Sequence, residues 1–83
     1  MPTFHLDIRT PEGLIPDEEG IDLPGLAEAR AEAVRRARSI MGGDVLAGSL
    51  RLDQSIEIRD RSGMLVEVVR FQDALRIISD LPG

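Results

Sequence analysis

Hydrophobic and polar residues alternate at the start of the chain. Three apolar residues would share one face of an extended segment: Phe4, Leu6 and Ile8. This period of two predicts a half-buried strand over residues 3–9. A turn at residues 10–13 and a short return strand at residues 14–16 follow. Pro16 has no backbone N–H, so the return strand lies at a sheet edge or ends there.

The period changes after a polar, acidic connection over residues 17–25. Apolar residues then recur at steps of three and four, as on one side of a helix: Leu26, Ala29, Ala33, Ala37, Ile40 and Met41. We therefore expect an amphipathic helix over residues 26–41, with Gly25 or Asp22 as its N-cap. The two glycines at 42–43 are expected to end it, and one further turn would follow at residues 45–47.

The C-terminal part again shows strand patterning. Residues 55–60 alternate, and the turn at residues 60–63 ends in a glycine, which predicts a hairpin. The returning strand, residues 64–71, is largely apolar on both faces, so both faces should be covered. A short helix predicted over residues 72–78 would supply the second cover, or a partner subunit would.

These elements predict an α+β fold. The order is ββαββ, with an antiparallel sheet, one long amphipathic helix on one face and a short C-terminal helix. The 83 residues suffice for one domain, which we expect to span residues 1–83. The core must be mostly aliphatic, because Phe4 and Phe71 are the only aromatic residues.

Composition excludes several kinds of site. Because the chain has no cysteine, a disulfide framework, a thiolate metal site and a cysteine nucleophile are all excluded. We see no signal peptide and no apolar stretch of the ~20 residues that would span a bilayer. The sequence therefore predicts a cytoplasmic protein with no membrane contact and no cofactor.

The net charge of −5 is concentrated near the N-terminus. Six acidic residues and one arginine precede residue 23, whereas nine arginines and nine acidic residues follow it. An acidic chain is poorly suited to nucleic acid, because that binding depends on basic groups that neutralise phosphates. We expect no nucleic-acid partner.

The only histidine, His5, is predicted to share a strand face with Asp7. A catalytic histidine needs a nucleophile or an orienting carboxylate, and Asp7 could be that partner. A surface pair without function is the more ordinary interpretation. We identify no catalytic residue and expect no enzymatic activity.

Two charged groups are the candidate binding residues. The acidic group follows the second strand and consists of Asp17, Glu18, Glu19 and Asp22; the basic group lies near the helix end and consists of Arg35, Arg36 and Arg38. Carboxylates at close spacing can bind a cation weakly, but the spacing of a calcium loop is missing. Both groups also complement the helix dipole, which is a sufficient structural reason for them.

The chain resembles a group of short, uncharacterised, mostly alphaproteobacterial proteins known only as a domain of unknown function. Residues 4–6, residues 17–24 (Asp-Glu-Glu-Gly-Ile-Asp-Leu-Pro) and residues 29–33 carry the resemblance, and residues 56–63 and 71–75 continue it. One departure is Gly25, where such proteins often have Asp. The resemblance implies no activity, ligand or partner.

A second resemblance, to HicB-type antitoxins, covers less of the chain. It is carried by residues 23–26, Leu-Pro-Gly-Leu, followed by Glu28-Ala29 at the helix entry. We expect a small non-enzymatic binding or regulatory module, with a protein partner or a second copy. The alternatives are an antitoxin-like protein that binds a basic partner through its acidic segment, and a weak metal binder or minimal enzyme using His5, Asp7 and the acidic loop.

Overall fold

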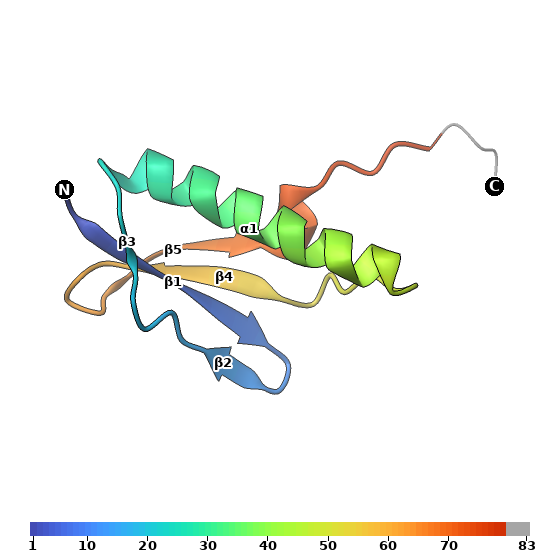
Figure 1. Ribbon diagram of the computed structural model, residues 1–83, viewed down its shortest axis with the longest axis horizontal. Helices are drawn as coiled ribbons and strands as arrows, with labels where there is room; N and C mark the ends of the chain where they lie inside the picture. The colour runs from blue at the N-terminus through green and yellow to red at the C-terminus, as the bar shows by residue number, and fades with distance from the viewer. Residues whose placement is uncertain (80–83) are drawn as a thin grey trace.

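The computed structural model of the protein describes residues 1–79. Within them, one long helix covers one face of a five-stranded antiparallel sheet (Figure 1). The elements, in chain order, are β1 (Thr3–Thr10), β2 (Gly13–Ile15), β3 (Ile21–Asp22), α1 (Leu26–Leu46), β4 (Ser55–Arg59), β5 (Leu65–Arg70) and the 3-10 helix η1 (Phe71–Ala74). The predicted α+β fold is confirmed.

Strand β1 has neighbours on both sides. It pairs with β4 on one side, and on the other side with β3 near its start and with β2 near its end. The sheet order is β2-β1-β4-β5, with β3 beside β1, so β5 is an edge strand. The sequence pattern predicts only a polar connection at the position of β3, because two residues are too short for a period of two to be recognised.

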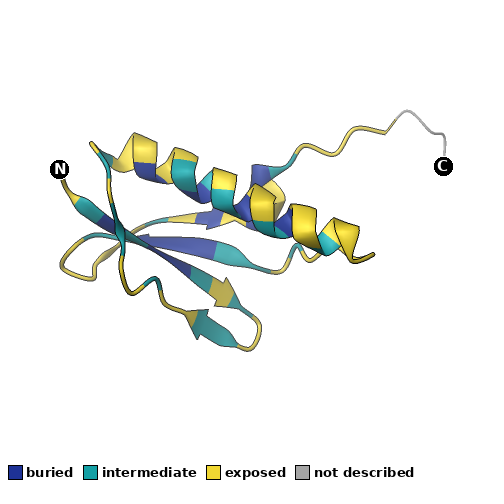
Figure 2. Ribbon diagram, viewed as in Figure 1, coloured by how far each residue is buried: buried dark blue, intermediate teal, exposed yellow. Residues whose placement is uncertain are grey.

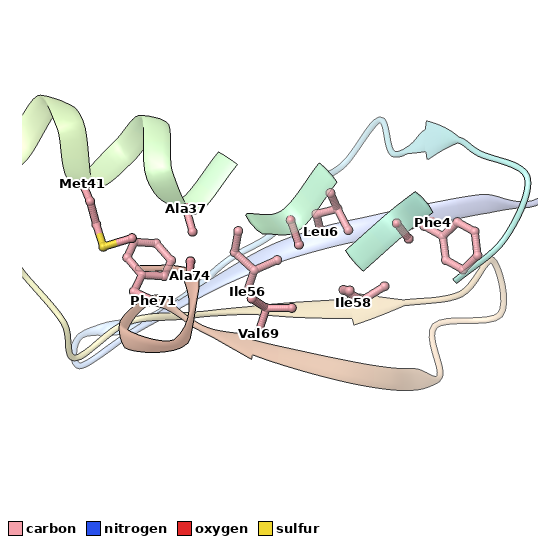
Figure 3. Packing of buried hydrophobic residues seen from close by; sticks show 11 residues of the cluster. Phe4, Leu6, Ala37, Met41, Ile56, Ile58, Val69, Phe71 and Ala74 are labelled. Atoms are coloured by element: carbon pink, nitrogen blue, oxygen red, sulfur yellow. The ribbon is translucent and has the colours of Figure 1, made fainter. Parts of the chain in front are cut away.

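Helix α1 packs its small side chains against the sheet. Ala29, Ala33, Ala37 and Met41 are buried along its lower side, as predicted (Figure 2). Ile40 is half-buried, whereas Leu26 is exposed in the first turn. The core is completed by residues from the sheet and η1, namely Phe4, Leu6, Ile56, Ile58, Val69, Phe71 and Ala74 (Figure 3). Alanine allows the helix axis to approach the strands closely.

The helix does not end at the glycines at 42–43, and that prediction is wrong. It continues to Leu46. A glycine inside a helix costs about 1 kcal/mol relative to alanine, but it can still adopt helical dihedrals and donate its N–H. Two glycines weaken this part of the helix without stopping it.

The true end lies at Gly48, whose φ of +97° is in the left-handed region. The Gly48 N–H donates to the Val45 carbonyl, and the Ser49 N–H donates to the Asp44 carbonyl. This pair of bonds forms the Schellman motif, which satisfies the last carbonyls of a helix. The turn predicted at residues 45–47 is therefore the end of the same helix.

Replacing Gly42 or Gly43 by alanine should stabilise the protein. Neither has a positive φ, and a Cβ at either position would meet no atom within 4 Å. We expect each change to raise the free energy of unfolding by about 0.5–1 kcal/mol, measured by urea denaturation. Gly48→Ala is the matched control and should lower it, because alanine disfavours a positive φ. A lower free energy of unfolding for Gly42→Ala would contradict the uninterrupted helix.

The predicted short C-terminal helix is present, but it spans Phe71–Ala74 and does not extend to residue 78. The chain makes one 3-10 turn, η1, and Leu75 then has extended backbone dihedrals. A continuing α-helix would need the Ala74 carbonyl to accept the N–H of Ile78. That carbonyl instead accepts a hydrogen bond of 2.8 Å from Nε of Arg38 on α1. Docking of η1 on the long helix therefore replaces helix extension.

Candidate functional site

The sheet face opposite α1 carries two carboxylates and two arginines in adjacent rows. Asp7 on β1 lies directly opposite Glu57 on β4. Arg9 Nε donates to Glu57 Oε2 at 2.8 Å, and Arg59 Nη2 donates to Glu57 Oε1 at 2.6 Å. Arg59 Nε also lies 3.2 Å from Asp7 Oδ2. The arginines therefore neutralise carboxylates that would otherwise repel each other across the strands.

This arrangement changes the acidity of Glu57. The hydrogen bond from Arg9, supported by that from Arg59, lowers the pKa of Glu57 although burial acts to raise it. The same carboxylate raises the pKa of Arg9. The two carboxylates and the two arginines pair with one another, and these ion pairs join β1 to β4.

The lowered pKa of Glu57 predicts a pH-dependent contribution to stability. A carboxylate whose pKa is lower when folded stabilises the protein above its ordinary pKa of 4.5 and loses that effect as the pH falls through the lowered value. The stability difference between the wild type and Glu57→Gln should therefore be largest near neutral pH and shrink in acid. Urea denaturation across pH 3–7 measures it. A difference between the wild type and Glu57→Gln that stays constant down to pH 3 would contradict this assignment.

Asp17 fills a gap along the outer edge of β1. Strands β3 and β2 pair with the two ends of that edge and leave its middle without a strand neighbour. There the Leu6 N–H donates to Asp17 Oδ2 at 3.0 Å, and the Asp17 N–H donates to Asp7 Oδ1 at 2.8 Å. The Gly20 N–H donates to Asp17 Oδ1 at 3.2 Å. The Asp17 carboxylate thus takes the place of a strand's carbonyl groups.

Gly20 allows the loop to lie close to β1. Its φ is +73°, and a Cβ built there would come within 2.9 Å of the Phe4 carbonyl oxygen. Residues with a side chain seldom adopt this φ, and the carbonyl belongs to the paired backbone of β1. Contacts with β1 therefore fix both ends of the Asp-Glu-Glu-Gly segment, Asp17 by its hydrogen bonds and Gly20 by its close approach.

The structure separates the four acidic candidates. Asp17 turns inward, and Asp22 accepts a hydrogen bond of 2.6 Å from Oγ1 of Thr3. Glu18 and Glu19 are exposed. Asp22 is exposed as well, although its Oδ1 is held by Thr3, so Asp17 alone of the four is directed into the fold.

The three arginine candidates are also divided. Arg35 and Arg36 both pair with Glu32, whose pKa is lowered chiefly by the hydrogen bond from Arg35. Arg36 additionally reaches Asp17, with 3.5 Å between Nη1 and Oδ2. This contact joins the acidic and basic candidates. Arg38 instead donates to the η1 backbone, so the three residues form no common basic patch.

His5 and Asp7 do not act on each other as an orienting pair. His5 Nδ1 lies 2.6 Å from the Asp17 carbonyl oxygen, so Nδ1 carries the proton and donates it. The Asp7 carboxylate faces the Asp17 N–H and Arg59 instead. A depression of about 310 Å³ lies beside them, bordered by the turn at residues 60–63. Among residues 1–79, no group of three His, Cys, Asp or Glu side chains is placed to hold a metal ion.

The strongest candidate surface is the edge formed by β5 and the residue before it. Four large apolar side chains are exposed there: Met64, Leu65, Val66 and Val68, with exposed fractions from 37% to 64%. We call these four residues the β5 edge. Val69 and Phe71, in contrast, point into the core. The apolar pattern predicts that both faces of this strand are covered, by the short C-terminal helix or by a partner subunit. Within residues 1–79 these four side chains are uncovered, and the sequence did not identify them as a site.

Comparison with known families now places the chain. The model of the Domain of unknown function DUF6894 matches residues 3–72. The chain belongs to the DUF6894 family. This confirms the predicted membership of an uncharacterised family, and the match covers every strand of the DUF6894 fold. No curated protein and no solved structure matches the chain. In the part that the structure describes, no helix is both long and apolar enough to cross a membrane.

Proposed function

We propose that this DUF6894 chain is a small non-enzymatic binding module that takes a protein partner along the β5 edge. The observation that carries the proposal is the exposure of four large apolar side chains on a terminal strand. An edge strand also offers unpaired backbone N–H and C=O groups to another chain. A partner that adds a strand would gain backbone hydrogen bonds and cover the apolar side chains at once.

The charges of β5 support this interpretation. Edge strands are commonly protected by charged side chains that hinder pairing with another chain. Here Glu67 Oε2 lies 3.1 Å from Arg30 Nη1 on α1. Arg70 Nε donates to Asp73 Oδ2 at 2.9 Å. Both β5 charges are therefore compensated within the chain, which leaves the edge close to neutral and open to an apolar partner.

The polar groups support a non-enzymatic role. A catalytic base needs a carboxylate or nucleophile that is directed at it. The Nδ1 proton of His5 is held by a backbone carbonyl, and Asp7 is held by a backbone N–H and Arg59. These contacts join the loop to β1 and β1 to β4, which is a structural use of the residues.

Native capture with mass spectrometry tests the proposal. We would compare the tagged wild type with the double variant Val66→Lys, Val68→Lys, whose lysines put charge on the β5 edge. Val68 lies opposite Glu57, so a lysine there is compatible with the fold. We expect a protein, either another copy of this chain or a different one, to be retained by the wild type and lost with the lysine variant.

A matched control changes exposed apolar residues elsewhere. Val45 and Leu46 are 58% and 92% exposed at the end of α1. The variant Val45→Lys, Leu46→Lys should retain the same protein as the wild type. Circular dichroism of all three chains verifies their folding. If capture is unaffected by the β5 variant, or is lost equally with the helix variant, the proposal is wrong.

One alternative has its own observation. Glu18 and Glu19 are adjacent and exposed, and they are the two acidic candidates without a described structural role. We propose as the second candidate an antitoxin-like protein that binds a basic partner there, in line with the resemblance to HicB-type antitoxins. The variant Glu18→Gln, Glu19→Gln should then release a small basic protein from native capture, while the β5 variant should keep it. Retention by the glutamine variant would remove this candidate.

A further inference from the structure

We infer that the partner at the β5 edge is a second copy of the same chain, which joins the two sheets into one continuous sheet. The inference rests on the proposed function, because it names the occupant of the same edge. It is carried by two observations, the compensated charge of β5 and the position of the acidic N-terminal segment in the fold.

The chain's net charge opposes self-association, and its location decides where two copies can meet. The −5 net charge arises within the first 22 residues. These residues form β1, β2, β3 and their connections, on the side of the sheet away from β5. Two copies that pair through β5 therefore hold their acidic segments at the far ends of the joint sheet. Repulsion between exposed charges falls off within about 10 Å at ordinary salt concentrations.

The opposite edge is a poorer contact for a second copy. Strands β2 and β3 are short, and the exposed Glu18 and Glu19 lie in the loop between them. Pairing there would bring like charges together, which costs several kcal/mol in interfaces. A basic partner would also be drawn to this acidic side and not to the neutral β5 edge. The charge distribution thus favours a second copy at β5.

The geometry of antiparallel pairing makes the contact self-complementary. A two-fold axis perpendicular to the sheet would run between the two β5 strands and place both α1 helices on the same face. Each copy would offer the same apolar residues to the other, as in isologous dimers. Val66 and Val68 of one copy would then contact the β5 edge of its partner and be shielded from water. Among the strands of residues 1–79, β5 is hydrogen-bonded to β4 alone.

Light scattering and sedimentation of the purified chain test the inference. We expect a mass of twice 9.1 kDa at high micromolar concentration. The Val66→Lys, Val68→Lys variant should have the mass of one copy, with association weakened roughly a hundredfold or more by like charges at the contact. The Val45→Lys, Leu46→Lys variant should retain the wild-type mass. Loss of the double mass in this control instead would place the contact at the helix end and overturn the inference.

A charge exchange makes the test specific for contact between copies. A glutamate variant, Val66→Glu, which leaves the position opposite Glu57 unchanged, should also be a single copy alone. Mixing it with the lysine variant should restore the double mass, because opposite charges then meet across the two strands. If both variants are folded and the mixture stays at the mass of one copy, the inferred β5 contact is contradicted.

The results separate this inference from the proposed function. A wild type that keeps the mass of one copy at high concentration overturns the inference alone if native capture still shows an edge-dependent partner. If the wild type keeps the mass of one copy and native capture shows no partner that depends on the β5 edge, the inference and the proposed function are both overturned. A double mass that the lysine variant loses and the charge exchange restores supports both.

Discussion

Phe71→Ala should remove about 3–5 kcal/mol from the free energy of unfolding, because it deletes the largest buried side chain in the core. Phe71 is 0% exposed and lies beside Met41 and Ala74 (Figure 3). Ala74 has no atoms that could fill the space, so a cavity would remain beside Met41. Domains are stable by only about 5–15 kcal/mol, so this loss removes a large part of the stability. Urea denaturation measures the change.

The control for this substitution is Ile78→Ala. Ile78 follows η1 in the same part of the chain but is 77% exposed. Its loss should alter the free energy of unfolding by less than about 0.5 kcal/mol. A comparable loss in both variants would show that residues after η1 belong to the folded core. A small loss at Phe71 alone would contradict the packing of η1 against α1.

Asp17→Ala should cost about 2–4 kcal/mol. The substitution removes the acceptor of the Leu6 and Gly20 N–H groups and the partner of Arg36. An unsatisfied buried donor costs about 1–3 kcal/mol, and the other lost contacts add to this. Hydrogen exchange should also become faster at the Leu6 amide. Chemical denaturation and amide exchange together measure the stability and the local effect.

Glu18→Ala is the matched control, because Glu18 is the exposed neighbour in the same acidic segment. It should change stability by less than about 0.5 kcal/mol. Equal changes in the free energy of unfolding for Asp17→Ala and Glu18→Ala would mean that the segment affects stability through its overall charge. A large effect confined to Asp17 would mean that the most recognisable part of the sequence is needed for folding, and that the Asp17 carboxylate is not available to a partner.

Much of the fold could be predicted because its pattern is local. Phe4 and Leu6 alternate with polar residues along β1, and this period of two identifies both the strand and its buried face. The steps of three and four from Ala29 to Met41 identify the helix in the same way. Ile56 and Ile58 are buried on β4 as their alternation indicated.

The ends of elements were harder to predict. The pair Gly42-Gly43 and the single Gly48 carry similar local signals for a helix end. Gly48 ends the helix because there the chain must turn toward β4, and the left-handed φ is required for that turn. Similarly, η1 stops at Ala74 because Nε of Arg38 on α1 donates a hydrogen bond to the Ala74 carbonyl. That carbonyl is then not used for a further helical turn. Both outcomes depend on residues of other elements.

The candidate site was the least predictable part. The sequence placed Asp17, Glu18 and Glu19 together, although the fold uses Asp17 inside and leaves the other two outside. That division arises from the gap between β2 and β3 along β1, which exists only once the strands are assembled.

The sequence by itself determined the α+β class, the faces of β1, β4 and α1, and the concentration of negative charge near the N-terminus. These depend on the order of residues along the chain. The tertiary structure alone decided that β5 is an edge strand with exposed apolar side chains, and that Asp17 completes the hydrogen bonds of β1. Both depend on which strands become neighbours in space, because an edge, or an unpaired N–H, is defined by the strand that is missing beside it.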